Sequence, residues 1–280
     1  MLGAIYGDIV GSRFEFQGFK SKKFEMFSDN CTFTDDTLMT LAIANTLMFE
    51  SLADKETLQR ITIFNMVDIY ERYPDTNWGT KFCEWLKGNK TPLNSFGNGA
   101  GMRISPVGWI ADSIEEVKQY SLALTEISHN HPEGIKGAEA IAMAVYLARI
   151  DKTKEEIKDY IGKHYYEEVL TTDFRWLQEN YGFVYKDEED GFDRKYVTCQ
   201  GSVPQAIIAF LASNNFEDAI RNAISLGGDS DTLACMCGSI AEAYYGMTFD
   251  QEYDVLDRLP DDLVGICYAF MSFRKKRVTR

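Results

Sequence analysis

The stretch FTDDTLMTLAIANTL, from Phe33 to Leu47, carries two adjacent carboxylates directly in front of an apolar run. Its apolar residues recur at the three- and four-residue spacing of a helix, which predicts a buried helix over Asp36–Glu50. Helix capping is the simplest explanation for the acidic start, with Thr34 as the N-cap and with Asp35 and Asp36 in the first turn. Each such effect stabilises a helix by about 0.3–1 kcal/mol, so this stretch alone does not require a functional role.

A second stretch, SLGGDSDTLACMCGSIAEAYYG from Ser225 to Gly246, opens another apolar helix in the same way. Two buried helix starts that both carry carboxylates are difficult to explain by capping alone, because buried carboxylates are costly unless cations neutralise them. Carboxylate and hydroxyl oxygens are hard ligands that suit Mg²⁺ or Mn²⁺ rather than zinc. We therefore predict a centre for two such ions, with independent capping of the two helices as the alternative. The predicted ligands are Thr34, Asp35, Asp36, Asp229, Asp231 and Thr232.

Helical spacing of apolar residues extends over most of the chain, whereas alternating runs of β-branched residues are scarce. We therefore expect an all-α fold, with one domain over residues 1–280. Pro204 suits the first turn of a helix, and Gly227–Gly228 suits a helix end that brings the following aspartates close to a neighbouring loop. The charged stretch KDEEDGFDRK, at 186–195, is expected to be a solvated loop. The predicted helices are Asp36–Glu50, Glu56–Tyr73, Ser113–Ile127, Ile135–Ile150, Lys154–His164, Pro204–Ala212, Phe216–Leu226, Thr232–Tyr245 and Asp261–Phe273.

The composition narrows the functional classes. The chain has 29 Lys and Arg against 43 Asp and Glu, which gives a net charge of −14. This charge disfavours sequence-independent binding to nucleic acid or to an anionic membrane surface. We expect neither a secretory leader nor a membrane-spanning helix, which needs roughly 18–20 apolar residues in a row. Six cysteines without a CxxC pair, and three histidines, make a zinc site unexpected. A monomeric cytoplasmic protein with reduced thiols is the expectation.

Two acidic residues near the N-terminus are further candidates for the site. Asp8 lies within an apolar segment, and Glu15 lies between Phe14 and Phe16. A carboxylate flanked by aromatic rings suits a general base or a ligand for substrate hydroxyls. The alternatives are that Asp8 pairs with a buried donor and that Glu15 faces water.

A glycine-rich stretch and a pair of histidines complete the candidate set. The stretch SFGNGAGMRISP, from Ser95 to Pro106, exposes successive backbone N–H groups that can hold phosphate oxygens, with Arg103 adding charge. It lacks the GxxxxGK[ST] pattern of a P-loop, so binding of a nucleoside triphosphate is not predicted. His129 and His131 precede a helix. One of them is expected to line a polar pocket and bind substrate, with packing at the helix start as the alternative.

Together these stretches resemble the ADP-ribosylglycohydrolase family. GDIVGSRFE, TDDT, NGAGMR, SHNHPEGIKGA and GGDSDT occur in the order and approximate spacing of the family's motifs, from Gly7 to Thr232. The resemblance implies an all-α, orthogonal helical bundle with a binuclear Mg²⁺ or Mn²⁺ centre held by the six predicted ligands. It implies a supporting role for Asp8 and a catalytic role for Glu15, with proton transfer by Glu15 or by a metal-binding aspartate, Asp36 or Asp229. ADP-ribose is expected to contact Asn98, Gly99, Gly101, Met102, Arg103 and His129.

The expected reaction is metal-dependent hydrolysis of the glycosidic bond at the distal ribose, through an oxocarbenium-like transition state. It would release ADP-ribose from an ADP-ribosylated protein or small molecule, and the acceptor, such as arginine or serine, stays open. The segment from Tyr165 to Gly201 carries no family motif, and its aromatic residues are expected to shape the acceptor site. The alternatives are a catalytically silent ADP-ribose-binding or immunity protein of the same fold, a two-metal phosphohydrolase, and a helical scaffold.

Overall fold

The computed structural model describes residues 1–49, 54–181 and 194–278. Fifteen α-helices lie within these residues, which contain no β-strand; an isolated antiparallel bridge pairs Gly97 with Thr198. The all-α prediction is therefore confirmed. The helices are α1 (Leu2–Gly11), α2 (Asp35–Leu47), α3 (Lys55–Arg72), α4 (Thr80–Lys87), α5 (Gly99–Met102), α6 (Ser105–Ile110), α7 (Ile114–Glu126), α8 (Pro132–Arg149), α9 (Lys154–Ile161), α10 (Phe174–Asn180), α11 (Cys199–Leu211), α12 (Phe216–Ser225), α13 (Ser230–Tyr245), α14 (Phe249–Leu256) and α15 (Asp261–Val278).

Each predicted helix has a counterpart. The largest differences lie at the start of α11 and at the end of α15, which continues from the predicted Phe273 to Val278. Pro204 was expected in the first turn, which is wrong, because α11 begins earlier and Pro204 lies inside it. The start is set by Thr198, whose hydroxyl oxygen accepts a hydrogen bond from the backbone N–H of Gly201 at 3.1 Å. Glu50 and most of the predicted solvated loop lie outside the described residues.

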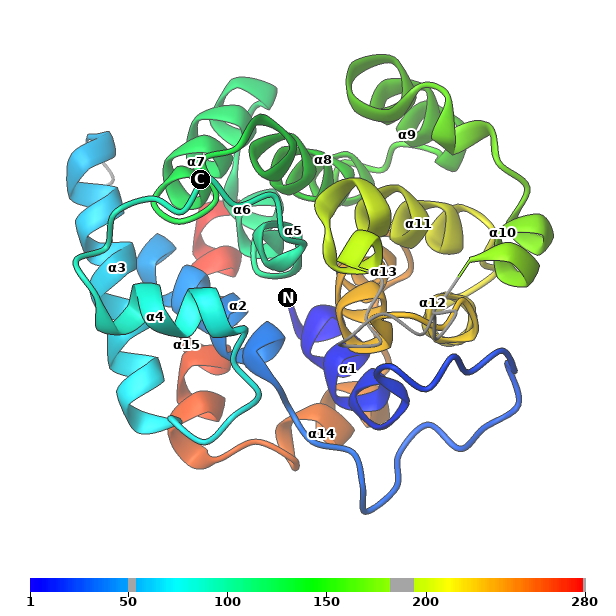
Figure 1. Ribbon diagram of the computed structural model, residues 1–280, viewed down its shortest axis with the longest axis horizontal. Helices are drawn as coiled ribbons and strands as arrows, with labels where there is room; N and C mark the ends of the chain where they lie inside the picture. Colours follow the sequence, from blue (N-terminus) through cyan, green and yellow to red (C-terminus); the bar gives the residue numbers. More distant parts are fainter. Residues whose placement is uncertain (50–53, 182–193, 279–280) are drawn as a thin grey trace.

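The first helix, α1, was not predicted, because all ten of its residues are buried and it therefore has no polar face. Its glycines recur at every fourth position and face α13. A Cβ atom at Gly3 would lie 2.3 Å from the carbonyl oxygen of Gly238, and one at Gly7 would lie 2.0 Å from that of Ala234. Only glycine permits this approach. Figure 1 shows the result, with α1 in blue directly beside α13 in orange.

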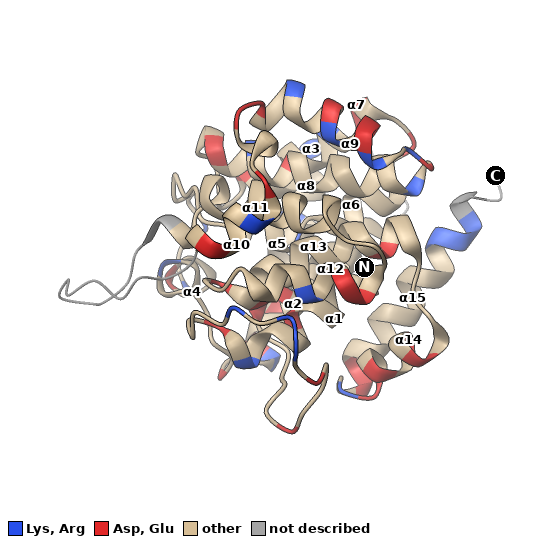
Figure 2. Cartoon of the chain, turned by 90° about the vertical axis from the view of Figure 1, so that its right-hand side faces the viewer, with Lys and Arg blue, Asp and Glu red and all other residues tan. Residues whose placement is uncertain are grey.

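Helix α13 is the centre of the bundle, since it contacts α1, α8, α11 and α12. Helices α2, α3 and α4 lie on one side of it in Figure 1, and α10, α11 and α12 lie on the other. Acidic and basic residues are interspersed over the face in Figure 2, with acidic residues on α14 and basic residues at the end of α15. Among the described helices, none combines the length and the apolar character that crossing a bilayer requires.

Candidate active site

The acidic residues lie close together where the C-terminal half of α1 meets the N-terminal ends of α2 and α13. The close contact of α1 with α13 sets this arrangement, because a Cβ atom at Gly11 would lie only 2.5 Å from the Cα atom of Asp231. The chain leaves α1 through a short 3₁₀ turn, Ser12–Phe14, which delivers Glu15 to the same place. Residues far apart in the sequence thereby surround one small volume.

Asp8 is fully buried and holds the start of α2. Its Oδ2 accepts hydrogen bonds from the backbone N–H groups of Thr34 at 2.9 Å and Thr37 at 3.1 Å, and its Oδ1 accepts one from the Thr34 hydroxyl at 2.7 Å. The Thr34 oxygen in turn accepts from the backbone N–H of Asp36 at 3.2 Å, as an N-cap does. Asp8 thus pairs with buried donors, which was one of the two readings of this residue.

Asp36 joins α2 to α13 and keeps one oxygen free of protein donors. Its Oδ2 accepts a hydrogen bond from the Thr232 hydroxyl at 3.2 Å. The side chain is only 2% exposed, and within the described residues its Oδ1 is buried without a hydrogen-bond partner. A buried carboxylate oxygen without a partner is costly, so this atom calls for a cation or another ligand.

The start of α13 is shaped by Gly227 and Gly228, whose φ angles are +71° and +77°. This turn places the Gly228 carbonyl oxygen 3.1 Å from the backbone N–H of Phe16, which donates to it. Asp229 is the N-cap residue, but its side chain makes no capping hydrogen bond. Its Oδ2 instead accepts from the Asn98 amide at 2.7 Å, which orients the carboxylate toward the glycine-rich stretch.

Two groups of carboxylates are each compact enough to surround a cation. Asp8, Asp36 and Asp231 form one group, and Glu15, Asp229 and Asp231 form the other. Within each group, one oxygen from each residue lies within 4.8 Å of the others. Because Asp231 belongs to both groups, the two are adjacent. A set made only of carboxylate oxygens fits Mg²⁺ or Mn²⁺, which prefer hard ligands.

Electrostatic repulsion in this centre is strong. Burial, and then the charges of neighbouring carboxylates, raise the pKa of Glu15 to about 8 and that of Asp35 to about 7. The same causes raise the pKa values of Asp36 and Asp231 well above the ordinary range. Carboxylates in this condition favour either protons or bound cations. Of the predicted ligand aspartates, Asp35 is the one that lies outside both groups.

The glycine-rich stretch leads into α5 and runs beside His129. A Cβ atom at Gly99 would lie 3.4 Å from His129 Nε2, and one at Gly97 would lie 3.7 Å from the same atom. Gly101 faces the interior instead, where a Cβ atom would lie 2.9 Å from the sulfur of Met236. The backbone approaches the imidazole closely at two positions, and Gly101 supports packing.

Several predicted substrate contacts are buried in the protein. Arg103 has no exposed surface, its Nη2 donates to the Ser128 hydroxyl oxygen at 2.7 Å, and its guanidinium lies 5.4 Å from the centre of the Phe82 ring. The side chain of Met102 is 5% exposed. His131 is the N-cap of α8, where its Nδ1 accepts from the backbone N–H of Glu133 at 3.1 Å. The packing reading therefore applies to His131.

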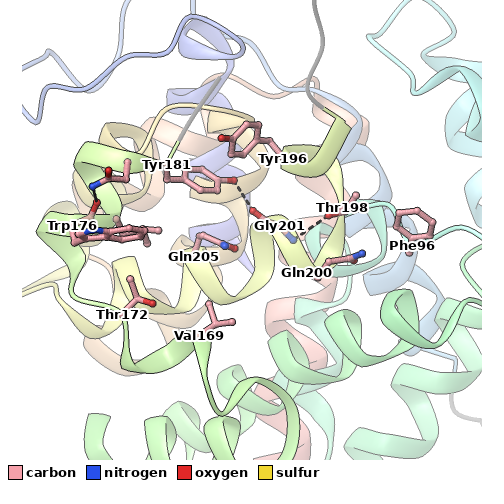
Figure 3. Close-up of a pocket in the computed structure, with 12 residues that line it drawn as sticks. Phe96, Val169, Thr172, Trp176, Tyr181, Tyr196, Thr198, Gln200, Gly201 and Gln205 are labelled. Atoms are coloured by element: carbon pink, nitrogen blue, oxygen red, sulfur yellow. Dashed lines mark hydrogen bonds between the residues drawn. The ribbon is translucent and has the colours of Figure 1, made fainter. Parts of the chain in front are cut away.

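A pocket of about 610 Å³ lies between α10 and the start of α11 (Figure 3). The Tyr181 hydroxyl donates to the Gly201 carbonyl at 2.7 Å, which fixes one wall. Ser202 connects the pocket to the acidic centre, since its hydroxyl donates to the Tyr196 carbonyl at 2.7 Å and accepts from the Asn98 amide at 3.1 Å. The lining residues are Phe96, Val169, Thr172, Trp176, Leu177, Asn180, Tyr181, Tyr196, Thr198, Gln200, Gly201 and Gln205.

Two features of the site were not apparent from the sequence. One is the membership of Asp8 in an acidic group, which the glycine spacing at positions 3, 7 and 11 could have indicated, since it places one face of α1 against α13. The other is the role of Ser128 and Ser202, two buried serines that link the predicted site residues. No local pattern distinguishes such serines from others in the chain.

Comparison with known proteins agrees with the motifs. The family model for ADP-ribosylglycohydrolase matches residues 1–269. Human ADP-ribosylhydrolase ARH3 is 26% identical over 285 residues, covering 85% of this chain and 75% of that protein. The ADP-ribosylarginine hydrolase Tri1 of Pseudomonas putida (strain GB-1) is 25% identical over 272 residues, covering 89% and 70%.

A solved structure described as an ADP-ribosylglycohydrolase-related protein complex has the same fold. Its TM-score is 0.60 at 22% identity, and the similarity covers 98% of this chain and 97% of that chain. With a family model that matches nearly the whole sequence, the family suggested by the five motifs is confirmed. The chain belongs to the ADP-ribosylglycohydrolase family, a family of ADP-ribosyl hydrolases.

Proposed function

We propose that this chain hydrolyses the glycosidic bond between ADP-ribose and an acceptor with two divalent cations, Mg²⁺ or Mn²⁺, at the acidic centre. The observation that carries the proposal is the pair of adjacent carboxylate groups that share Asp231, with the unpartnered Asp36 Oδ1 among them. The family membership supports the ADP-ribosyl part of the proposal. The proposed ligands are Asp8, Glu15, Thr34, Asp35, Asp36, Asp229, Asp231 and Thr232.

The residues around the centre have separate tasks in this proposal. Bound divalent cations supply Lewis-acid polarisation of hydroxyl groups and water. Glu15 is half-buried and close to Asp229 and Asp231, so it is placed to move a proton to or from a reacting oxygen. Asn98 holds Asp229 by a hydrogen bond. The sequence suggested successive free N–H groups in the glycine-rich stretch, but those of Gly97, Asn98, Ala100 and Gly101 already donate within the protein. The N–H of Gly99, the first residue of α5, is therefore proposed to hold the diphosphate together with His129.

The pocket between α10 and α11 is proposed to receive the acceptor side of the substrate. Two hydrogen-bonded residues, Ser202 and Asn98, connect Tyr196 in the wall of this pocket to Asp229 in the acidic centre. Aromatic and amide side chains line the pocket. Trp176 lines this pocket and is 58% exposed, so removing its ring should leave the fold intact. Trp176→Ala is expected to raise KM for a peptide substrate several-fold with little change in kcat, whereas Phe249→Ala, at a distant exposed position, should change neither. Equal KM values in both variants would contradict this placement.

Product analysis tests the reaction. ADP-ribosyl-arginine and ADP-ribosyl-serine peptides would be incubated with the protein in Mg²⁺, in Mn²⁺ and in EDTA, and the products separated. Release of intact ADP-ribose that EDTA abolishes would support the proposal and identify the acceptor. Release of AMP would instead indicate a phosphohydrolase, and binding of ADP-ribose without product would indicate a silent binding protein. Retained metal affinity and turnover in Asp36→Asn would contradict the two-cation centre.

We also propose that the protein is a cytoplasmic monomer. All six cysteines are free, which is compatible with a reducing compartment. The mass of the chain is 31.9 kDa, so light scattering would distinguish a monomer from a dimer directly.

A further inference from the structure

Three side chains form a buried polar chain beneath the glycine-rich stretch. Arg103 Nη2 donates to the Ser128 hydroxyl oxygen at 2.7 Å, and the same oxygen lies 2.9 Å from His129 Nδ1. Arg103 and Ser128 have no exposed surface, and His129 is 6% exposed. Because Arg103 donates to the serine that contacts His129, it influences which nitrogen of the imidazole carries the proton.

Counting hydrogens at the Ser128 oxygen identifies the proton position. Arginine is a donor only, so Ser128 must accept from Arg103. If His129 Nδ1 also donated, the serine oxygen would receive two hydrogens and its own hydroxyl proton would be buried without an acceptor, at a cost of about 1–3 kcal/mol. If the serine instead donates to Nδ1, both hydrogens at the serine oxygen, its own and the one from Arg103 Nη2, lie in hydrogen bonds. In that arrangement Nδ1 is the acceptor and the ring proton lies on Nε2.

The surroundings favour the neutral ring. Burial and the nearby positive charge of Arg103 lower the pKa of His129 well below its usual value. Arg103 itself stays charged over the Phe82 ring, and its Nε and Nη1 have no hydrogen-bond partner among the described residues. The imidazole therefore carries one proton, and Ser128 decides which nitrogen holds it.

The Nε2 atom is the one that faces the glycine-rich stretch, at 3.4 Å from a Cβ placed on Gly99. We propose that Arg103 and Ser128 are positioning residues that hold His129 in the Nε2–H tautomer, so that the ring donates a hydrogen bond to an oxygen of the bound substrate. Arg103 thus acts through Ser128 and the imidazole, not by direct contact with a phosphate. The tautomer is independent of the proposed function, and only the identification of the acceptor oxygen with an ADP-ribose oxygen rests on it.

Nitrogen NMR of histidine-labelled protein tests the tautomer without an activity assay. Two-bond ¹H–¹⁵N spectra of the full chain would be recorded near neutral pH, and His129 assigned by the signals missing from His129→Gln. We expect a pyrrole-type Nε2 and a pyridine-type Nδ1 in the wild type. Ser128→Ala should give a mixture of tautomers, whereas Ser121→Ala, at another fully buried serine, should leave the pattern unchanged. A protonated Nδ1 in the wild type would overturn the proposal even if Ser128→Ala failed to fold.

Binding and turnover then test the role of the donor. Affinity for ADP-ribose should fall in Ser128→Ala by the reciprocal of the fraction that keeps the Nε2–H tautomer, about twofold for an equal mixture, and recover in Ser128→Thr. KM should rise while kcat changes little, because the contact is to a bound, non-reacting group. An altered tautomer with unchanged ADP-ribose affinity would overturn the substrate contact. The predicted tautomer in a protein that neither binds nor hydrolyses ADP-ribosyl compounds would leave the positioning role standing and overturn the proposed function.

Discussion

Helices α2 and α13 begin with the same kinds of residue, yet the two starts are built differently. At α2 the N-cap Thr34 accepts from the backbone N–H of Asp36, and Asp8 accepts from the backbone of the first turn. At α13 the N-cap Asp229 makes no capping bond and turns its carboxylate to Asn98. Thr34 and Asp8 therefore satisfy backbone N–H groups at the start of α2, whereas the N-cap carboxylate of α13 bonds to Asn98 and not to the backbone of its own helix.

This difference shows that capping and ligand binding are separable demands on similar sequences. Independent capping of both helices, one of the two explanations for the acidic clusters, is right for Thr34 and wrong for Asp229. A buried carboxylate at a helix start loses its hydration, which destabilises the protein, and without a capping hydrogen bond this loss is not offset within the helix. The backbone conformations differ accordingly, since Thr34 is extended, with a ψ angle of −167°, whereas Asp229 has a ψ angle of 78° after the two glycines with positive φ. Four changes would test the contrast.

Asp231→Asn is expected to have the largest effect, because Asp231 belongs to both carboxylate groups. Under the proposed function kcat/KM should fall by about 10²–10³-fold or more, the loss typical of a removed electrostatic partner. The rise in melting temperature that Mg²⁺ or Mn²⁺ produces should also disappear, since a ligand that binds the folded state stabilises it. Thermal unfolding with and without each cation measures this.

Asp159→Asn is the matched control for Asp231→Asn, because Asp159 is exposed on α9, outside both carboxylate groups. It should keep both the activity and the cation-dependent shift. An Asp231→Asn variant that still gained stability from the cations would show that the shared residue is not a ligand.

Removing all cations should make stability depend on pH in one direction. The folded-state pKa values of Glu15, about 8, and Asp35, about 7, lie above the ordinary values of these acids. The folded state therefore binds more protons than the unfolded state above about pH 4, so the free energy of unfolding falls as pH rises toward 8. Urea unfolding of metal-free protein at several pH values should show this decline, and saturating Mg²⁺ should reduce it. Stability that rose over the same range would contradict the repulsion described for the centre.

The helices with a polar face and the two acidic pairs could be predicted from the sequence. The tertiary contacts that bring them together could not. α2 and α13 were predicted because their apolar runs follow TDDT and GGDSDT. α1 was missed because it is buried on all sides and, unlike the similarly buried α2, has neither a capping side chain nor an acidic first turn to mark its start. Arg103 was expected to add positive charge at a phosphate, because an arginine after glycines is typical of an anion site. The structure buries Arg103, and its hydrogen bond to Ser128, 25 residues away in the sequence, cannot be predicted from the local sequence.

Thr34→Ala should have a moderate effect on stability, because it removes the N-cap of α2 and the donor to Asp8 Oδ1. A loss of about 1–3 kcal/mol in the free energy of unfolding is expected in EDTA, from the lost cap and the unpaired buried oxygen. Thr34→Ser keeps the hydroxyl and should lose much less. Equal losses in the two variants would mean that the methyl group, and not the cap, stabilises this helix start.

Asp229→Asn should have the smallest effect on stability, and it probes the other helix start. Asn can still accept from the Asn98 amide through its side-chain oxygen, no capping bond exists to be lost, and one of the mutually repelling carboxylates is removed. In EDTA its free energy of unfolding should equal or slightly exceed that of the wild type, whereas activity with cations should fall strongly. If Asp229→Asn instead destabilised the metal-free protein as much as Thr34→Ala does, both helices would be capped alike, and the contrast between the two starts would be lost.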